Sequence, residues 1–306
     1  MKLPQSVEEV AALLKGQNYI SSTSTSTIVF LAIQMQRPIL VEGPAGVGKT
    51  ELAKSLAKGL GVELIHLQCY EGLDETKAIY EWEYAKQLLY TQLLKEKIHD
   101  LVRHEDNLSE AVKKVISVEN AFFSEHFLLP RPLLKSITLG KPNVLLIDEV
   151  DKSDPEFEAY LLEVLSTYQI TIPELGTLSA KVPPMVFLTS NAARDLSDAL
   201  KRRCLHLFID FPTSALESQI VRQKFPGLSE RLIGRMVKAI GLIREMDLRK
   251  KPSIAETLDW AQALVSLQAQ DLTPQDLTTT LGVIVKYQSD ADQVQKKAAL
   301  ILEEAP

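Results

Sequence analysis

The sequence predicts an α/β protein in which a parallel sheet with helices on both faces precedes a separate all-helical domain. Three observations lead to this fold class. A short apolar run at 38–42 leads through a glycine-rich loop into a helical pattern at 51–59. Helical patterns separate most of four further apolar runs, which lie at 62–68, 144–147, 185–189 and 206–211. After Phe211-Pro212 only helical patterns follow.

Two helices are expected before the first strand. Ser6 and Glu9 have the spacing of a capping box, and Gly16 follows a helical apolar stripe, so a helix is predicted at 6–15. The serine- and threonine-rich run at 21–27 reads as a turn and cap that leads into a buried helix from Ile28 onward.

The connection to the third strand is too long for a single crossover. Helical patterns at 83–104 and 108–120 predict a helical insertion at about 76–140. A β-hairpin insert is predicted at about 169–182, with strands at 169–172 and 178–182 on either side of Gly176. These elements place a nucleotide-binding α/β domain at 1–212.

The rest of the chain, 213–306, is expected to form a helical lid domain. Pro226-Gly227, Pro252 and Pro274 separate its helical patterns. The predicted helices lie at 214–224, 229–247, 253–268, 274–286 and 290–303.

Composition narrows the function classes. The chain has 306 residues, of which 45% are hydrophobic and 24% charged, as in ordinary globular proteins. No apolar run approaches the ~20 residues that span a bilayer, and the N-terminus does not resemble a cleavable signal, so a cytoplasmic protein without a membrane span is expected. The formal charge of −6 argues against a general nucleic-acid surface. Cys69 and Cys204 lack the spacing of a zinc site.

The glycine-rich loop is the most specific motif. Glycines there let the backbone approach phosphate groups, and the following helix directs its partial positive end to the same place. Lys49 is expected to reach the β- and γ-phosphates, and Thr50 to offer its hydroxyl to Mg²⁺. The sequence therefore predicts binding of ATP or ADP with Mg²⁺ by Gly43, Pro44, Ala45, Gly46, Val47, Gly48, Lys49 and Thr50.

Acidic and amide side chains follow two of the other strands. Asp148 and Glu149 end the apolar run 144–147, at the sheet edge where ligands bind in open α/β folds. Asp148 is expected to hold Mg²⁺, and Glu149 to polarise the water that attacks the γ-phosphate. Asn191 ends the fourth strand, where its amide could bind both the γ-phosphate and that water.

Arg202 and Arg203 lie just before the fifth strand, next to Lys201. Three adjacent cations usually form a solvated patch, and charge alone favours that interpretation. The alternative is that one of them reaches the ATP of a neighbouring subunit, where an arginine accelerates phosphoryl transfer about 10³–10⁵-fold.

In this order, the motifs resemble those of AAA+ ATPases over essentially the whole chain. Asp148-Glu149, Asn191 and the two arginines match the Walker B, sensor 1 and arginine-finger positions of that family. More narrowly, the chain resembles the MoxR branch and its CoxD-like members. The segments that carry this resemblance are 43–51, which includes Glu51, and 67–75, 80–84, 147–152 and 199–204.

The resemblance implies a homo-oligomeric ring, usually of six subunits, with ATP at the subunit boundaries. It implies that Arg203, directly before Cys204, is the finger and that Arg202 shares the role. It also implies that the segment 70–84 and the hairpin face the ring pore. Many MoxR proteins carry a sensor 2 arginine in a Ser-Pro-Arg context, whereas this chain has Lys251-Pro252-Ser253.

CoxD-like proteins are implicated in maturing the metal centre of molybdenum-containing carbon monoxide dehydrogenases. The leading hypothesis is therefore an ATP-driven chaperone that remodels a client metalloenzyme, with a von Willebrand A-type protein as a further partner and membrane association only through a partner. The alternatives are a nucleotide-switched assembly module, a nucleic-acid motor or loader, which the acidic charge disfavours, and a small-molecule kinase, which would not need the arginines or the helical tail.

Overall fold

The computed structural model describes residues 3–103 and 124–305. Its centre is a five-stranded, all-parallel sheet, which confirms the predicted fold class. The spatial order is β2-β5-β8-β1-β9. The strands are β1 (Ile39–Glu42), β2 (Glu63–Gln68), β5 (Asn143–Asp148), β8 (Met185–Ser190) and β9 (Leu205–Phe208).

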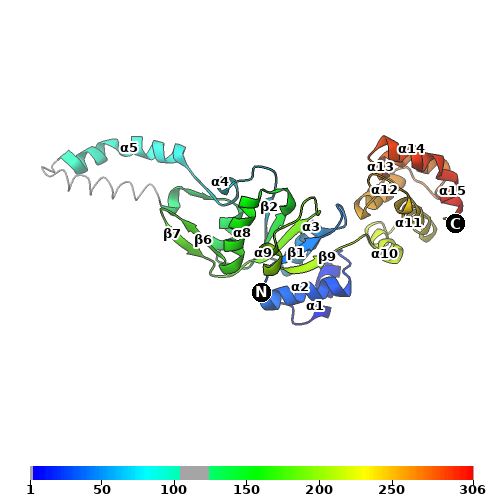
Figure 1. The fold of residues 1–306 in the computed structure, drawn as a ribbon, viewed down its shortest axis with the longest axis horizontal. Helices are drawn as coiled ribbons and strands as arrows, with labels where there is room; N and C mark the ends of the chain where they lie inside the picture. The colour runs from blue at the N-terminus through cyan, green and yellow to red at the C-terminus, as the bar shows by residue number, and fades with distance from the viewer. Residues whose placement is uncertain (1–2, 104–123, 306) are drawn as a thin grey trace.

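Alternation along the strands explains the layers, because successive side chains of a strand point to opposite faces of the sheet. Ile39 and Val41 pack with α1 (Val7–Gly16), α2 (Thr23–Met35) and α3 (Lys49–Leu60). Leu40 packs on the other face with α7 (Pro132–Thr138), α8 (Pro155–Thr167) and α9 (Asp198–Arg203). Figure 1 shows these helices around the sheet.

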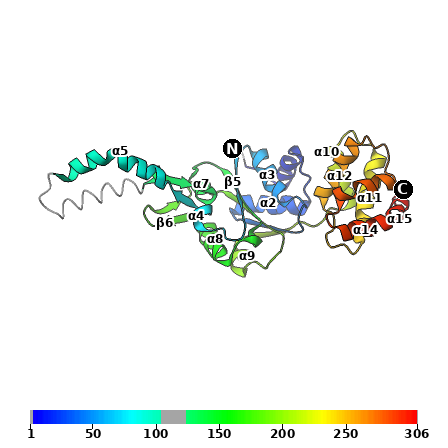
Figure 2. The ribbon, with the colours of Figure 1, turned by 90° about the horizontal axis from the view of Figure 1, so that it is seen from above.

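The insertion differs in part from the predicted one. It contains α4 (Glu75–Ala78), a small antiparallel sheet of β3 (Tyr80–Trp82) and β4 (Leu128–Pro130), α5 (Tyr84–Arg103) and the short helix η1 (Glu125–Phe127). α7, which the predicted range includes, packs against β2 and β5 and is an ordinary crossover helix. The predicted helix at 108–120 lies outside the described residues. α5 projects away from the sheet (Figures 1 and 2).

The hairpin consists of β6 (Gln169–Ile172) and β7 (Gly176–Ser179). Its second strand begins at Gly176, which pairs with Ile172, and so starts earlier than the predicted 178–182. A short helix, η2 (Val150–Lys152), follows β5 directly.

Helices alone form the C-terminal part, which has its own core around the fully buried Trp260, whose indole donates to Thr280 Oγ1 at 2.7 Å. The last predicted helix is two helices that meet at Lys297. The elements are α10 (Ser214–Lys224), α11 (Glu230–Glu245), α12 (Ile254–Ser266), α13 (Pro274–Ile284), α14 (Gln288–Lys296) and α15 (Ala298–Glu303). Across residues 3–103 and 124–305, no helix is both long and apolar enough to cross a membrane.

Candidate nucleotide-binding site

The loop between β1 and α3 lies at the carboxyl edge of the sheet. Two of its glycines are required by close approaches as well as by positive φ angles. A Cβ on Gly43 (φ 148°) would lie 1.9 Å from the carbonyl oxygen of Ile209, and one on Gly46 (φ 79°) would lie 2.1 Å from Ser253 Oγ. The loop is therefore packed against the chain that leads to the helical part and against the start of α12. α3 begins at Lys49, two residues before the predicted start.

Lys49 folds back over this loop. Its ammonium donates to the carbonyl oxygens of Gly43 and Pro44 and to Asn191 Oδ1, each at 2.7 Å. Burial lowers the pKa of Lys49, and the nearby carboxylates of Asp151, Asp148 and Glu149 oppose that shift. The Lys49 ammonium is thus held within the glycine-rich loop by three neutral oxygen acceptors.

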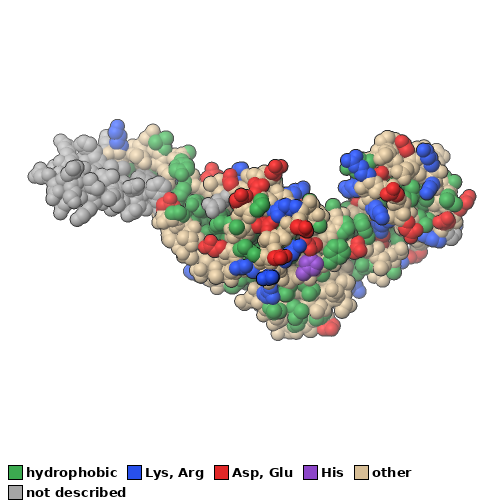
Figure 3. All heavy atoms as spheres, viewed as in Figure 1, with side chains coloured by type: hydrophobic (Ala, Val, Ile, Leu, Met, Phe, Trp, Pro, Cys, Tyr) green, Lys and Arg blue, Asp and Glu red, His purple; other side chains and the backbone are tan. Residues whose placement is uncertain are grey.

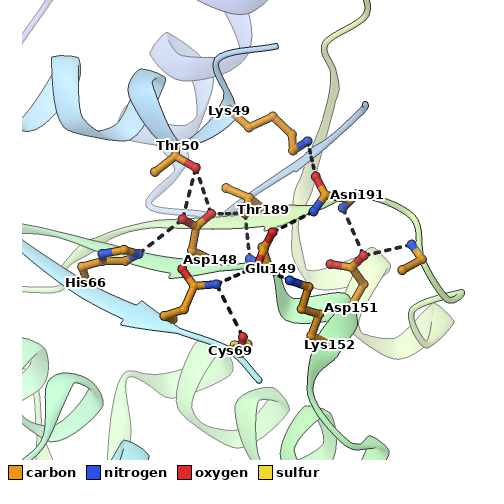
Figure 4. Close-up of polar contacts among 12 residues, drawn as sticks. Lys49, Thr50, His66, Cys69, Asp148, Glu149, Asp151, Lys152, Thr189 and Asn191 are labelled. Atoms are coloured by element: carbon orange, nitrogen blue, oxygen red, sulfur yellow. Dashed lines mark hydrogen bonds and ion pairs between the residues drawn. The ribbon is translucent and has the colours of Figure 1, made fainter. Parts of the chain in front are cut away.

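Asp148 lies at the end of β5 and faces the start of α3 (Figure 4). Its carboxylate accepts from Thr50 Oγ1 at 3.0 and 3.1 Å and from the Thr189 hydroxyl. His66 Nε2 lies 3.3 Å from its Oδ2. The pairing of β2 and β8 with β5 brings His66 and Thr189 to this carboxylate. Thr50 and Asp148 are thus adjacent, as the sequence predicts.

Glu149 follows in a left-handed conformation (φ 56°). Its N–H donates to Thr189 Oγ1 at 2.9 Å, and its Oε1 accepts from Asn191 Nδ2 at 3.0 Å. Its Oε2 accepts from Gln68 Nε2 at 2.9 Å and from Lys152 Nζ at 2.7 Å. The Glu149 hydrogen bond raises the pKa of Lys152. Every carboxylate oxygen of Glu149 is therefore held by a donor (Figure 4).

Asp151 holds the backbone that follows β8 through hydrogen bonds. One of its oxygens accepts from the N–H groups of Asn191 at 3.1 Å and of Ala193 at 2.9 Å. This buried carboxylate fixes the turn from which the Asn191 side chain points toward both Lys49 and Glu149.

Lys49, Thr50, Asp148, Glu149 and Asn191 line a cavity of about 360 Å³. Thr50 and Asp148 are oxygen donors of the kind that Mg²⁺ takes, and one or two protein ligands suffice where phosphates and water complete its octahedron. No group of three or more His, Cys, Asp or Glu in the described residues could hold a metal by itself. The residues present fit a Mg²⁺–phosphate group. The cavity is lined by Ala45, Gly46, Gly48, Lys49, Thr50, Glu51, Gln68, Asp148, Glu149, Thr189, Asn191 and Ala255.

A second cavity, of about 400 Å³, adjoins the first and shares Gly46, Gly48, Glu51 and Ala255 with it. Most of its exposed wall is apolar. Burial and the nearby Glu51 raise the pKa of Tyr19, so its hydroxyl is neutral. The further lining includes Tyr19, Ile20, Val47, Phe208, Ile209, Phe211, Leu216, Ile254 and Leu258. This cavity has room for a nucleobase, and its apolar wall suits an aromatic ring.

Comparison with known proteins agrees with this geometry. The family described as AAA domain (dynein-related subfamily) matches residues 38–204, which run from the start of β1 to the end of α9. The chain belongs to this AAA family. Its members are nucleotide-hydrolysing AAA+ ATPases.

Relatives of similar length occur in staphylococci and are described as uncharacterized proteins. One from Staphylococcus haemolyticus is 22% identical over 95% of this chain and 99% of its own length. One from Staphylococcus epidermidis is 22% identical over 85% and 88% of the two chains, and one from Staphylococcus aureus is 23% identical over 76% and 77%.

In this AAA protein, the structure brings together all the sequence-predicted site residues except the two arginines. Arg202 and Arg203 end α9, before β9, and hence lie at the opposite edge of the sheet from Gly43 and Glu149. The two edges are roughly 13 Å apart, which is the length of the four residues of β1. Arg203 Nε donates to Ser166 Oγ on α8, whereas the exposed Arg202 side chain has no hydrogen bond or ion pair with a described residue.

Sequence reasoning missed five polar residues of this AAA site: His66, Gln68, Asp151, Thr189 and Lys152. Gln68 ends β2 and Thr189 is the next-to-last residue of β8, and both strands flank β5, so the sheet order, once known, places them beside Asp148 and Glu149. Lys152 comes three residues after Glu149 and forms an ion pair with it. The apolar wall of the second cavity has no single local motif, because its residues come from the N-terminal segment, the glycine-rich loop, β9 and the chain after it, and α12.

The two cysteines do not line either cavity. Cys69 and Cys204 are buried free thiols, and burial raises the pKa of each to about 12. Neither is a thiolate near neutral pH, which agrees with a packing role.

Proposed function

We propose that this AAA protein is a Mg²⁺-dependent ATPase whose site is completed by a neighbouring subunit. The observation that carries the proposal is the position of Asn191. Its Oδ1 accepts from Lys49 and its Nδ2 donates to Glu149. The Asn191 amide therefore links the Lys49 ammonium, which is expected to bind phosphate, to the Glu149 carboxylate, which is expected to activate water. All three side chains line the same cavity.

Each side chain then has a role that its chemistry supports. Lys49 and the loop N–H groups bind the β- and γ-phosphates, and the apolar cavity beside Tyr19 takes the adenine. Thr50 and Asp148 hold Mg²⁺, which when bound neutralises charge that develops on the phosphate oxygens. Glu149 accepts a proton from the attacking water, and Asn191 orients that water.

The arginines support the need for a neighbour. The cavity has no arginine among the described residues that line it, while Arg202 and Arg203 lie at the far edge of the same sheet. A phosphoryl-transfer site gains about 10³–10⁵ in rate from such a cation. We therefore assign Arg203, with Arg202 as a second contributor, to the ATP of an adjacent subunit in a homo-oligomeric ring, which the MoxR resemblance suggests has six members.

The work performed by this ring is proposed to be remodelling of a client protein. The resemblance to CoxD-like MoxR proteins points to a client metalloenzyme such as a molybdenum hydroxylase, and to a von Willebrand A-type partner. The shape of the insertion supports contact with another protein. α5 projects beyond the sheet, and hydrophobic side chains lie at the surface of its described part (Figure 3). Tyr84, Leu88 and Leu93 on this helix are each more than 60% exposed. Exposed apolar side chains on a projecting helix are typical of an interaction surface.

A nucleotide-switched assembly module is the second candidate. It is favoured by the contacts of Glu149 Oε2, which Gln68 and Lys152 both occupy. A base engaged in this way is expected to turn over slowly until the contacts change. Hydrolysis that stays slow whether or not a client is added would favour this switch over the remodelling ATPase.

The proposal is tested by steady-state ATP hydrolysis with Mg²⁺ and with excess EDTA. We expect turnover only with Mg²⁺, loss of ATP binding in Lys49→Ala, and little change in Lys58→Ala, an exposed lysine on the same helix. Sedimentation with a non-hydrolysable ATP analogue should show a larger assembly. Equal hydrolysis in EDTA, or an active Lys49→Ala variant, would overturn the assignment. Capture of proteins by a Glu149→Gln variant with ATP then addresses the client.

A further inference from the structure

The segment that carries Arg202 and Arg203 is held by another arginine, Arg37, at the start of the sheet. Arg37 lies two residues before Ile39, the first residue of β1, and β1 pairs with β9 in parallel so that Ile39 lies beside Leu205. Arg37 and Arg203 each come two residues before this pair, and they lie beside each other. The N–H of Leu205 donates to the carbonyl oxygen of Pro38 at 2.8 Å, which ties the two chains together at this point.

The guanidinium of Arg37 binds three consecutive carbonyl groups. Its NH2 nitrogen donates to the oxygen of Arg202 at 2.7 Å and to that of Cys204 at 3.3 Å, and its Nε donates to that of Arg203 at 3.3 Å. These are the orphan acceptors at the C-terminus of α9, where a cation also complements the helix dipole. The planar fork of arginine can satisfy several acceptors at once, whereas the single ammonium of lysine cannot match its geometry.

Further hydrogen bonds join the segment around Arg37 to the ends of α2 and α8. Gln36, directly before Arg37, is in a left-handed conformation (φ 51°), and its carbonyl oxygen accepts from the hydroxyl of Tyr168 at 2.9 Å. Tyr168 follows α8, the helix that also carries Ser166, the acceptor for Arg203 Nε. The C-terminal ends of α2, α8 and α9 are therefore joined around Arg37.

From this arrangement we propose that Arg37 is a positioning residue for the arginine finger. It contacts neither the nucleotide cavity nor the reacting atoms of its own subunit. It fixes the backbone from which Arg202 and Arg203 project, and so acts on hydrolysis in the adjacent subunit. The inference rests on the proposed function, because it requires a ring in which the finger works across the subunit boundary.

The test uses mixed assemblies of two variants that are each impaired in hydrolysis. Arg37→Met subunits keep an intact Lys49–Glu149 site but present a misplaced finger. Glu149→Gln subunits lack the base but keep an intact finger. Mixing the two should return activity severalfold above the sum of the separate proteins. Alone, Arg37→Met should lower kcat about 10–100-fold, a fraction of the effect of removing a finger, with the KM for ATP unchanged. Arg37→Lys should lie between Arg37→Met and the natural protein.

Two controls separate the possible failures. Arg203→Ala mixed with Glu149→Gln tests the finger itself, and no recovery there would overturn both the trans site and the role of Arg37. Recovery with Arg203→Ala but none with Arg37→Met or Arg37→Lys would overturn only the role of Arg37. Arg235→Met removes an arginine that binds the carbonyl oxygens of Leu302 and Ala305 in the helical part. Any loss that it causes arises within its own subunit and should not recover on mixing.

Discussion

Asn191 Nδ2 lies 3.0 Å from Glu149 Oε1, although these residues follow different strands and are 42 positions apart in the chain. The adjacency of β5 and β8 creates this contact. Asn191 also accepts a hydrogen bond from Lys49, so its amide contacts both the lysine expected to bind phosphate and Glu149. We therefore expect a phosphate bound by Lys49 to affect Glu149 through the Asn191 amide.

Replacing Asn191 by alanine tests this connection. The variant should keep ATP binding, because the loop and Lys49 remain, and should lose turnover on the order of 10²-fold, as when a positioned donor is removed from other active sites. Steady-state kinetics give kcat and KM separately. A large rise in KM with normal kcat would show that Asn191 serves only in binding.

Thr189 is predicted to support both acidic residues. Its buried hydroxyl donates to Asp148 and accepts the N–H of Glu149. Thr189→Val preserves the shape but leaves the N–H of Glu149 without its acceptor and removes one of the donors to Asp148. This should lower the free energy of unfolding by about 1–3 kcal/mol and reduce hydrolysis. Thr177→Val, at an exposed hairpin position, is the matched control. Denaturant unfolding measures the stability, and equal stability of the two variants would contradict this role.

Gly46 couples the phosphate loop to α12. A Cβ there would meet Ser253 Oγ at 2.1 Å, and the backbone is already at φ 79°. Gly46→Ala should therefore weaken ATP binding more than tenfold, the equivalent of about 1.4 kcal/mol, by displacing either the loop or the helix. Gly227→Ala, where an added Cβ has open space, should bind normally. Calorimetric titration with ATP compares them, and equal affinities would exclude a contact between the loop and α12 that matters for binding.

The cavity beside Tyr19 is expected to hold adenine. Leu258→Trp should fill part of this cavity of about 400 Å³ and raise the KM for ATP, with little change in kcat. Val265→Trp places the same side chain at an exposed position of α12 and should have no effect. If both variants bind ATP as the natural protein does, the base lies elsewhere.

Local sequence patterns predicted the sheet, the phosphate loop and the polar residues at strand ends, because each depends on a short motif. Asp148, Glu149 and Asn191 could be found since polar side chains follow buried apolar runs there. Patterns could not show which strands are neighbours, and so missed Gln68, Thr189 and His66, whose relevance depends on the order β2-β5-β8.

The departures from prediction have similar causes. The apolar pattern at 290–303 suggested one helix, but the helical geometry ends at Lys297 and a new helix begins at Ala298. α7 was assigned to the insertion by its distance along the chain, whereas Leu133, Leu134 and Ile137 bury it against the main sheet. The Arg37 contacts depend on the pairing of β1 with β9 and have no signature in either segment alone.

We propose above that Glu149 activates water at an ATP site formed by Lys49, Thr50 and Asp148. The most direct measurement compares ATP binding and steady-state hydrolysis in Glu149→Gln with those in Glu163→Gln, an exposed control on α8. We expect Glu149→Gln to bind ATP as tightly as the natural protein and to lose turnover by about 10²–10⁴-fold, and Glu163→Gln to be unaffected. Undiminished hydrolysis in Glu149→Gln would contradict the proposal.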